Sequence, residues 1–169
     1  MPSHLRQKDK DDKLGILDVR VLLNNKEQID IEIQVTASEY WAERTLFYLG
    51  KMFTDQLKPG EDYQKLEKCI HIGILNFTMF EDEEYYSCFH FWSDQGRKMY
   101  SDKVEIHTLE LPKLAKYEYP ETELLKWLQF INAETKEEFE MAAEKSEYIK
   151  KAYEDLNRIS ADEEKQSGI

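Results

Sequence analysis

Three polar residues, Asp18, Glu32 and Gln34, stand at even-numbered positions in two runs of alternating character. In residues 28–35 every odd position is Ile or Val and every even position is polar, and the odd positions of residues 17–23 are also apolar. A period of two is typical of a β-strand with one buried and one polar face. The short polar stretch 24–27 between the runs predicts an antiparallel hairpin. If even positions face even positions across it, all three side chains lie on one face of the sheet.

Two carboxylates held that close together repel each other unless a cation lies between them. Mg²⁺ prefers oxygen ligands, usually one or two carboxylates together with waters and substrate phosphate oxygens. A metal site of this kind can generate hydroxide near neutral pH and stabilise charge on a phosphoryl group. The alternation also fits an ordinary hairpin with a solvated polar face, so the spacing by itself leaves both interpretations open.

A longer set of motifs resembles the PD-(D/E)XK nuclease superfamily. Asp18, then a hairpin, then Glu32-Ile33-Gln34 has the superfamily's arrangement, with Gln34 in the position where most members have Lys. More narrowly, residues 13–113 resemble the Rpn family, recombination-promoting nucleases that are also described as transposases. The blocks that carry the resemblance are Ile31–Gln34, Glu43-Arg44 with Tyr48, Gln56-Leu57 with Gly60 and Tyr63, Ile70–Phe77, and Leu109–Lys113.

The resemblance implies an α/β fold, with a PD-(D/E)XK (restriction-endonuclease-like) core over residues 14–118 and a helical C-terminal extension over residues 119–169. In the core, helices flank a mixed central sheet, and we expect the hairpin near the centre of that sheet. The implied activity is a Mg²⁺-dependent DNA endonuclease, with Mn²⁺ as a substitute metal. The implied catalytic residues are Asp18, Glu32 and Gln34. Asp18, Glu32 and the backbone carbonyl of Ile33 would hold the metal, and Arg44 would contact a substrate phosphate.

A second interpretation is a non-catalytic relative that binds and regulates a full-length nuclease or another protein. Rpn-family members usually carry a further N-terminal helical segment before the Asp strand, and we expect this chain to lack it. The net charge of −12 also favours this interpretation, because an acidic surface can occupy a basic nucleic-acid groove. The presence of Asp18, Glu32 and Gln34 favours the enzyme. DNA, a second copy in a homodimer and a related nuclease subunit all stay open as partners.

The acidic excess is unevenly distributed along the chain. Residues 1–60 carry 9 basic and 10 acidic side chains, whereas residues 121–169 carry 7 and 13. Because affinity for duplex DNA comes largely from Lys and Arg contacts with phosphates, tight non-specific binding by this chain is disfavoured. The hairpin lies where the charges nearly balance, which leaves room for a nuclease that holds DNA through a metal and a few cations.

The two cysteines, Cys69 and Cys88, lie in apolar, strand-like runs and do not form a C-x-x-C pair. We expect buried thiols in a reducing compartment. No apolar run reaches the roughly 18 residues of a membrane span, and residues 1–6 lack the apolar core of a signal peptide. The sequence therefore predicts a cytoplasmic protein without a membrane partner.

Further elements follow the hairpin. Thr36 and Glu39 have the spacing of a capping box, so we expect a helix to begin there and to end at Lys58–Gly60, with Arg44 on its far side. Strands are predicted at 69–75, 85–92 and 104–111, each with one histidine in a hydrogen-bonded structural role. Two helices should complete the chain, at 123–131 and 135–159. The apolar face of the first helix is predicted to be a wide stripe that holds Trp41, Thr45, Tyr48 and Met52, with Ala42, Leu46, Leu49 and Phe53 beside them. The next helix should present Leu124, Trp127, Leu128 and Ile131.

Overall fold

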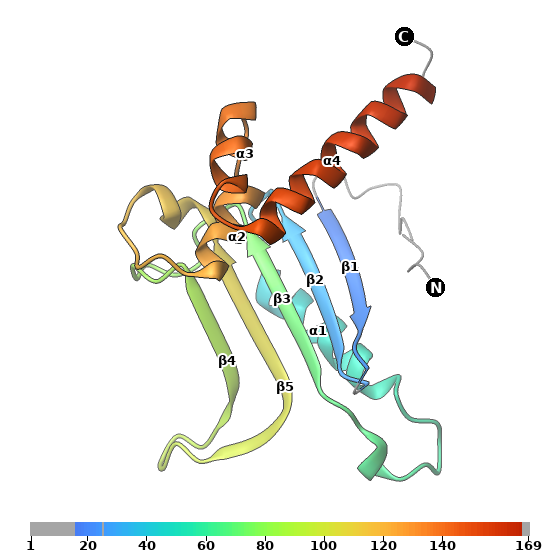
Figure 1. Ribbon diagram of the computed structural model, residues 1–169. Coiled ribbons are helices and arrows are strands. Elements are labelled where there is room, and N and C mark those ends of the chain that lie inside the picture. The colour runs from blue at the N-terminus through green and yellow to red at the C-terminus, as the bar shows by residue number, and fades with distance from the viewer. Residues whose placement is uncertain (1–15, 25, 167–169) are drawn as a thin grey trace. The chain divides into compact units, whose positions relative to one another are not determined.

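The computed structural model describes residues 16–24 and 26–166 and divides the chain into two compact units, residues 1–116 and 117–169. In the described part of the first unit, five strands form one mixed sheet (Figure 1) in the order β1-β2-β3-β5-β4. β2 runs parallel to β3 and β3 parallel to β5, whereas the β1–β2 and β4–β5 pairs are antiparallel. The predicted α/β class is confirmed. The strands are β1 (Ile16–Leu22), β2 (Gln28–Gln34), β3 (Cys69–Leu75), β4 (Tyr86–Trp92) and β5 (Met99–Glu110).

The hairpin does not lie at the centre of the sheet, contrary to our expectation. β1 stands at one end of the strand order, and β3 takes the middle position. The reason lies in burial: β3 is buried or half-buried at every residue, whereas Asp18, Arg20 and Leu22 of β1 are exposed. A strand that is apolar on both faces is stable only between two neighbours and beneath covering elements.

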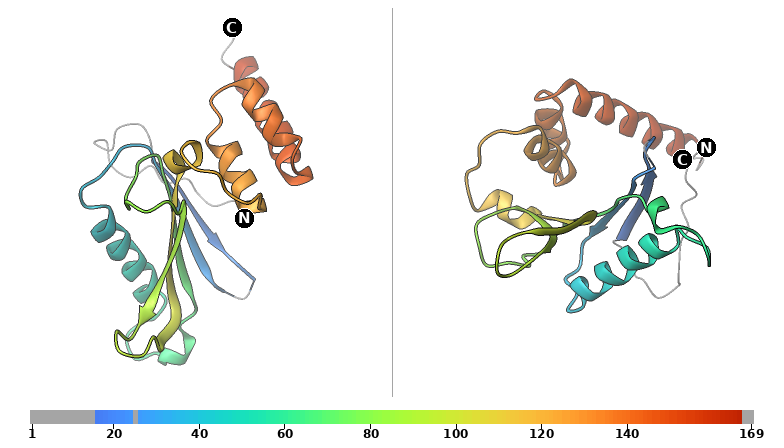
Figure 2. Two further views of the ribbon diagram at one scale, coloured as in Figure 1. Left: turned by 90° about the vertical axis from the view of Figure 1, so that its left-hand side faces the viewer. Right: turned by 90° about the horizontal axis from the view of Figure 1, so that it is seen from below.

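Helix α1 (Trp41–Thr54) covers one face of the sheet, as Figures 1 and 2 show. Its ends differ from the prediction. The helix begins after Tyr40, which makes no side-chain cap, so the predicted capping box at Thr36 is wrong; it ends four residues before Lys58. The buried stripe is also narrower than predicted, because Ala42, Leu46 and Tyr48 are exposed. The buried residues of α1 are Trp41, Thr45, Leu49 and Met52.

Close packing of α1 on the sheet depends on Gly73 in the central strand. A β-carbon at this position would lie 2.6 Å from the Trp41 ring, which no side chain could tolerate without movement. Further along the helix, Leu49 and Met52 pack against Cys69 in a core cluster. These contacts fix the helix directly above the face that carries Asp18 and Glu32.

Two short 3₁₀ helices, η1 (Tyr63–Lys65) and η2 (Leu111–Ala115), complete the first unit. The second unit consists of α2 (Glu123–Ile131), α3 (Lys136–Ala143) and α4 (Glu147–Gln166). The predicted single helix 135–159 is therefore two helices, and a capping box at Thr135 and Glu138 begins the first of them. The apolar face of α2 also shifts, since Leu125 and Leu128 are buried whereas Leu124 and Ile131 are exposed. Among the described residues, no helix has the length and hydrophobicity to span a membrane.

Candidate active site

Asp18 and Glu32 face each other directly across the β1–β2 pair. Gln34 lies two residues further along β2, opposite Ile16, and therefore points to the same face. The hairpin thus keeps even positions opposite even positions, as its alternation predicts. Glu32 and Gln34 are buried beneath α1, whereas Asp18 on the outer strand is exposed to solvent. The three residues with candidate catalytic roles share one face, and their catalytic roles stay predictions.

Arg44 of α1 reaches into this face. Its Nη2 atom lies 3.2 Å from Oε1 of Glu32, and its guanidinium lies over the Tyr48 ring, 5.5 Å from the ring centroid. We expected Arg44 on the side of the helix away from the core. Its long side chain instead folds back over the sheet and reaches the carboxylate from the flank of the helix. The arginine is therefore within reach of any anion bound beside Glu32.

Two further residues, which were not predicted as site residues, belong to this site. Asp30 shares the even parity of Glu32 on β2, and His71 lies opposite Asp30 on β3. The His71 Nδ1 atom lies 3.2 Å from Asp30 Oδ2, and both side chains are buried. Parity could have identified Asp30. His71 could have been identified only from the register between β2 and β3, which are separated by a helix in the sequence. We call Asp18, Asp30 and Glu32, with Gln34, Arg44 and His71, the acidic cluster.

Ionisation of the acidic cluster is unfavourable at two of its three carboxyl groups. Although the Asp18 residue is exposed overall, partial desolvation of its carboxyl group raises its pKa, and a hydrogen bond to Asp30 raises it further. Burial also raises the pKa of Glu32, although the charge of Arg44 opposes the shift. Burial acts on Asp30 in the same sense, but the hydrogen bonds to His71 and Asp18 outweigh it and lower the Asp30 pKa. A cation bound beside carboxyl groups with raised pKa values would stabilise their ionised form.

Unsatisfied polar atoms concentrate at the same place. Five buried side-chain atoms in the described part of the chain make no hydrogen bond, and all five belong to β2, α1 and β3 on this face; one of them, Glu32 Oε1, has only its ion pair with Arg44. Buried polar groups normally find partners, so such a concentration points to ligands or waters that complete the site. The Gln34 amide illustrates this: its Nε2 donates to the backbone oxygen of Thr36, at 2.9 Å, which leaves its oxygen free. The five atoms are Glu32 Oε1, Gln34 Oε1, Arg44 Nε, Thr45 Oγ1 and His71 Nε2.

The chemistry of these donors fits a hard divalent cation. Among the described residues, no group of three or more His, Cys, Asp or Glu side chains is arranged to hold a metal ion by itself. Mg²⁺ does not need such a group, because it usually binds through one or two carboxylates and takes the rest of its ligands from waters and phosphates. Asp18 and Glu32 offer two carboxylates, and Gln34 Oε1 offers a free amide oxygen. Ile33 lies between them in β2; the role expected for its carbonyl stays a prediction.

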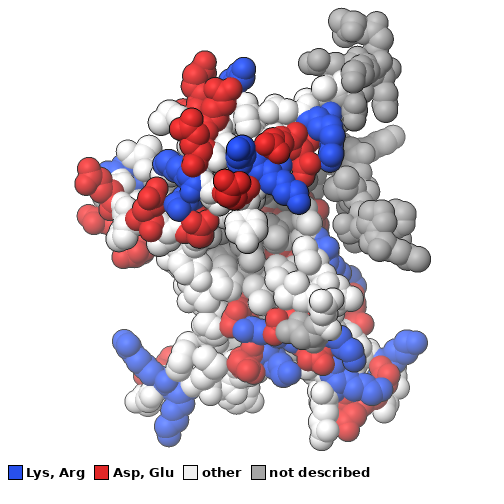
Figure 3. Space-filling view, viewed as in Figure 1, with Lys and Arg blue, Asp and Glu red and all other residues white. Residues whose placement is uncertain are grey.

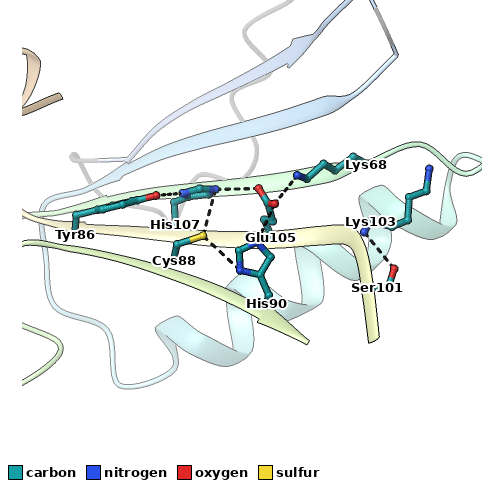
Figure 4. A network of polar contacts seen from close by, with 8 residues as sticks. All are labelled: Lys68, Tyr86, Cys88, His90, Ser101, Lys103, Glu105 and His107. Atoms are coloured by element: carbon teal, nitrogen blue, oxygen red, sulfur yellow. Dashed lines mark hydrogen bonds and ion pairs between the residues drawn. The ribbon is translucent and has the colours of Figure 1, made fainter. Parts of the chain in front are cut away.

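A second polar group occupies the opposite face of the sheet (Figure 4). At its centre Glu105 of β5 accepts from Lys68, its Oε1 lies 2.9 Å from His90 Nε2, and its Oε2 lies 3.3 Å from His107 Nε2. Burial opposes ionisation of Glu105, but these hydrogen bonds outweigh it and lower the pKa to about 2. We call this group the Glu105 network. Its members are Lys68, Tyr86, Cys88, His90, Glu105 and His107.

The Glu105 network also corrects the prediction for the cysteines. Both thiols are free, but only Cys69 is buried, and Cys88 is exposed on β4. The Cys88 Sγ atom lies 3.8 Å from His90 Nδ1 and 3.9 Å from His107 Nε2. His90 and His107 have the hydrogen-bonded environment that we predicted. Their convergence on one carboxylate depends on the pairing of β4 with β5.

Comparison with known proteins agrees with this geometry. A family model described as PD-(D/E)XK nuclease family transposase matches residues 1–168. The search of curated proteins and the search of solved structures each returned no match. The matched family has nuclease chemistry, which in the PD-(D/E)XK superfamily generally depends on a divalent metal, and its substrate is DNA. With a match over nearly the whole chain, a mixed sheet and a hairpin that pairs Asp18 with Glu32, this protein belongs to the PD-(D/E)XK nuclease family transposases.

Proposed function

We propose that this chain is a Mg²⁺-dependent DNA endonuclease whose active site is the acidic cluster. The observation that carries the proposal is the direct pairing of Asp18 with Glu32 beside unsatisfied buried oxygens. Asp18 and Glu32 would hold the metal, with the backbone carbonyl of Ile33 as a further ligand. When bound, Mg²⁺ supplies activation of a water molecule and stabilisation of negative charge on the phosphate. The raised pKa values of Asp18 and Glu32 support the proposal, because a bound cation would stabilise the two ionised carboxylates.

Gln34 takes the position in which most PD-(D/E)XK enzymes have a lysine. A lysine ammonium can both orient the attacking water and stabilise the charge that develops on the phosphate. The amide of Gln34 can accept a hydrogen bond from that water through its free Oε1, but it contributes no positive charge. Part of the electrostatic stabilisation must therefore come from another group.

Arg44 is the cation best placed to supply that stabilisation. Its guanidinium is half-buried and already pairs with Glu32, and its Nε has no partner among the described residues. Arginine binds phosphate oxygens through two parallel N–H groups. We infer that Arg44 contacts the scissile phosphate of a bound substrate. Glu32 would not need Arg44 as its counter-ion when it holds a metal, which would leave the guanidinium available for the phosphate.

A nicking assay on supercoiled plasmid DNA, with Mg²⁺ or Mn²⁺, tests this proposal. Loss of a metal ligand should lower the cleavage rate by about 1,000-fold or more in Asp18→Ala and in Glu32→Ala. Glu105→Gln is the matched control, because it removes a buried carboxylate from the other face and should leave cleavage within about twofold. Calorimetry should show weak Mg²⁺ binding to the wild type that both alanine variants lose.

Two results would contradict the proposal. Cleavage that persists in both alanine variants would place the active site elsewhere. Metal binding by the wild type without any cleavage would instead support the regulatory interpretation, in which the chain binds a nuclease or another protein and performs no chemistry.

A further inference from the structure

The tip of the β4–β5 hairpin exposes an unusual set of large aromatic side chains. Phe91 is 54% exposed, Trp92 50% and Tyr100 90%. Apolar side chains grouped in this way on a surface commonly mark a binding site, because water contact is unfavourable for them. The neighbouring Met99 is exposed as well. We call residues 91–103 the aromatic tip.

The backbone of the aromatic tip is well ordered by its own hydrogen bonds. The Ser93 N–H donates to the Lys98 oxygen at 3.0 Å, and the Arg97 N–H donates to the Ser93 oxygen at 3.1 Å. The hydroxyl of Ser93 accepts from the Lys98 N–H at 3.1 Å, and Arg97 adopts a left-handed conformation with φ of +45°. A loop closed in this way holds its side chains in place before a ligand arrives, which lowers the entropic cost of binding.

A β-bulge sets the direction of the most exposed ring. Phe91 pairs with Ser101 and Trp92 pairs with Met99, so Tyr100 is an extra residue on β5 with no partner on β4. Bulges of this kind re-aim side chains and often lie next to functional sites. The rings and their neighbours border an open hollow of about 410 Å³. It is lined by Phe91, Trp92, Ser93, Lys98, Met99 and Tyr100.

Positive charge surrounds these rings. The aromatic tip carries Arg97, Lys98 and Lys103 against two aspartates, in a chain whose net charge is −12. Figure 3 shows Lys and Arg side chains at the lower left, over the ends of β4 and β5. In the described part of the chain, the salt bridges include none of these three cations, and Figure 4 shows the Lys103 ammonium apart from the Glu105 network. Unpaired cations beside aromatic rings suit a polyanion with flat bases better than an apolar protein surface.

We propose that the aromatic tip binds an unpaired segment of a DNA strand, with a base stacked in the hollow against Trp92 or Tyr100. Arg97, Lys98 and Lys103 contact the adjoining phosphates. The proposal rests on the proposed function, because it supplies the DNA contact that an acidic nuclease needs outside its active site. Single strands bind in this way because every base has a π face that an aromatic ring can stack upon.

The position of the aromatic tip separates binding from cleavage. Glu32 lies level with Gly73 of β3, Thr108 of β5 and Ser87 of β4, and Phe91 lies four residues after Ser87 on β4. At about 3.3 Å per residue along a strand and about 4.8 Å between neighbouring strands, Glu32 and the aromatic tip are roughly 20 Å apart. One DNA strand is long enough to contact both, and substitutions at one site should leave the other intact.

The test is fluorescence anisotropy with a labelled single-stranded oligonucleotide and its duplex, at low salt and without metal, so that no cleavage occurs. Trp92→Ala and Tyr100→Ala should each weaken single-strand binding about tenfold, and Trp92→Phe should retain most of it. Arg97→Ala and Lys98→Ala should each reduce the salt dependence of binding by about 0.7 in the log–log slope. Tyr63→Ala and Lys58→Ala are the matched controls at exposed positions outside the tip, and should change affinity by less than twofold.

Each outcome decides one proposal. The tip proposal fails if the wild type binds no single strand, or if Trp92→Ala and Tyr100→Ala, folded by circular dichroism, bind as well as the wild type. Variants that alter the oligomeric state in light scattering and leave DNA affinity unchanged would show a contact between copies instead. If the wild type binds through the tip but does not cleave, the nuclease proposal alone fails.

Discussion

The acidic cluster and the Glu105 network lie on opposite faces of one sheet and differ in how their polar atoms are partnered. Glu105 accepts from one lysine and two histidines, and its pKa falls to about 2. In the acidic cluster the pKa values of Asp18 and Glu32 rise instead, and five buried atoms of that face lack partners. A satisfied network stabilises the fold. An unsatisfied one costs stability, which a protein retains where a ligand completes the site.

Lys113 shows that buried charges on the acidic-cluster face of the sheet can also be fully partnered. Glu110 of β5 lies in the same row as Gln34 and is only 1% exposed, yet its Oε2 accepts from Lys113 Nζ at 2.9 Å. The ammonium also donates to Asp82 Oδ1 and to the Glu84 oxygen, so all three of its protons are used. Charges can be fully partnered on this face of the sheet. The lack of hydrogen bonds at the polar atoms of the acidic cluster is therefore specific to that site.

Loss of the Lys113 ammonium should have the largest effect on stability. Lys113→Met leaves Glu110 buried without its cation, so we expect the free energy of unfolding to fall by about 3 to 5 kcal/mol in urea melts. Lys51→Met is the control, because its salt bridge with Asp55 is exposed and should contribute less than about 0.5 kcal/mol. Equal effects in the two variants would mean that the buried pair is not specially stabilising.

Disruption of the Glu105 network should have the next largest effect on the free energy of unfolding. Glu105→Gln weakens three charge-assisted hydrogen bonds and should lower the free energy of unfolding at pH 7 by about 1.5 to 3 kcal/mol. Glu32→Gln removes a more deeply buried carboxylate from the acidic cluster and should nevertheless cost clearly less, because ionisation of Glu32 is unfavourable in the fold. Denaturant melts of both variants compare the two faces directly, and a larger loss in Glu32→Gln would reverse the comparison.

The contribution of Glu105 should also depend on pH. Its folded-state pKa, about 2, is below the ordinary value of 4.5, so the stabilisation is complete above about pH 4.5 and is lost as pH falls toward 2. Urea melts of the wild type and Glu105→Gln between pH 7 and pH 3 should show their difference shrinking only below about pH 5. A difference that stays constant down to pH 3 would contradict the lowered pKa.

Asp18→Asn should give the smallest change, and of opposite sign. The raised pKa means that ionised Asp18 destabilises the fold at pH 7, so the neutral amide should raise the melting temperature by about 1 to 3 °C. The effect is small because Asp18 is exposed and water screens its charge. Mg²⁺ should raise the melting temperature of the wild type but not of this variant. A lower melting temperature in Asp18→Asn would show that the carboxylate stabilises the fold without metal.

The local pattern of the sequence determined which side chains of the hairpin share a face. Alternation in residues 28–35 and a short connecting loop are enough to place Asp18, Glu32 and Gln34 together, because side chains of paired strands alternate in step. The family resemblance rests on several ordered blocks and names the same residues. Strands 69–75 and 85–92 and helix 123–131 were also predictable to within a residue, because each has a clear period, whereas the strand predicted at 104–111 begins five residues earlier, at Met99.

Tertiary structure decided what surrounds those residues. The partnership of His71 with Asp30 requires a parallel register between strands more than thirty residues apart, and the contact of Arg44 with Glu32 requires the packing of α1 on the sheet. The hairpin lies toward the edge of the sheet because β3, which is buried or half-buried at every residue, takes the middle position between two neighbouring strands. The bulge that exposes Tyr100 follows from unequal pairing of β4 and β5. Each depends on contacts between distant segments, which a local period does not specify.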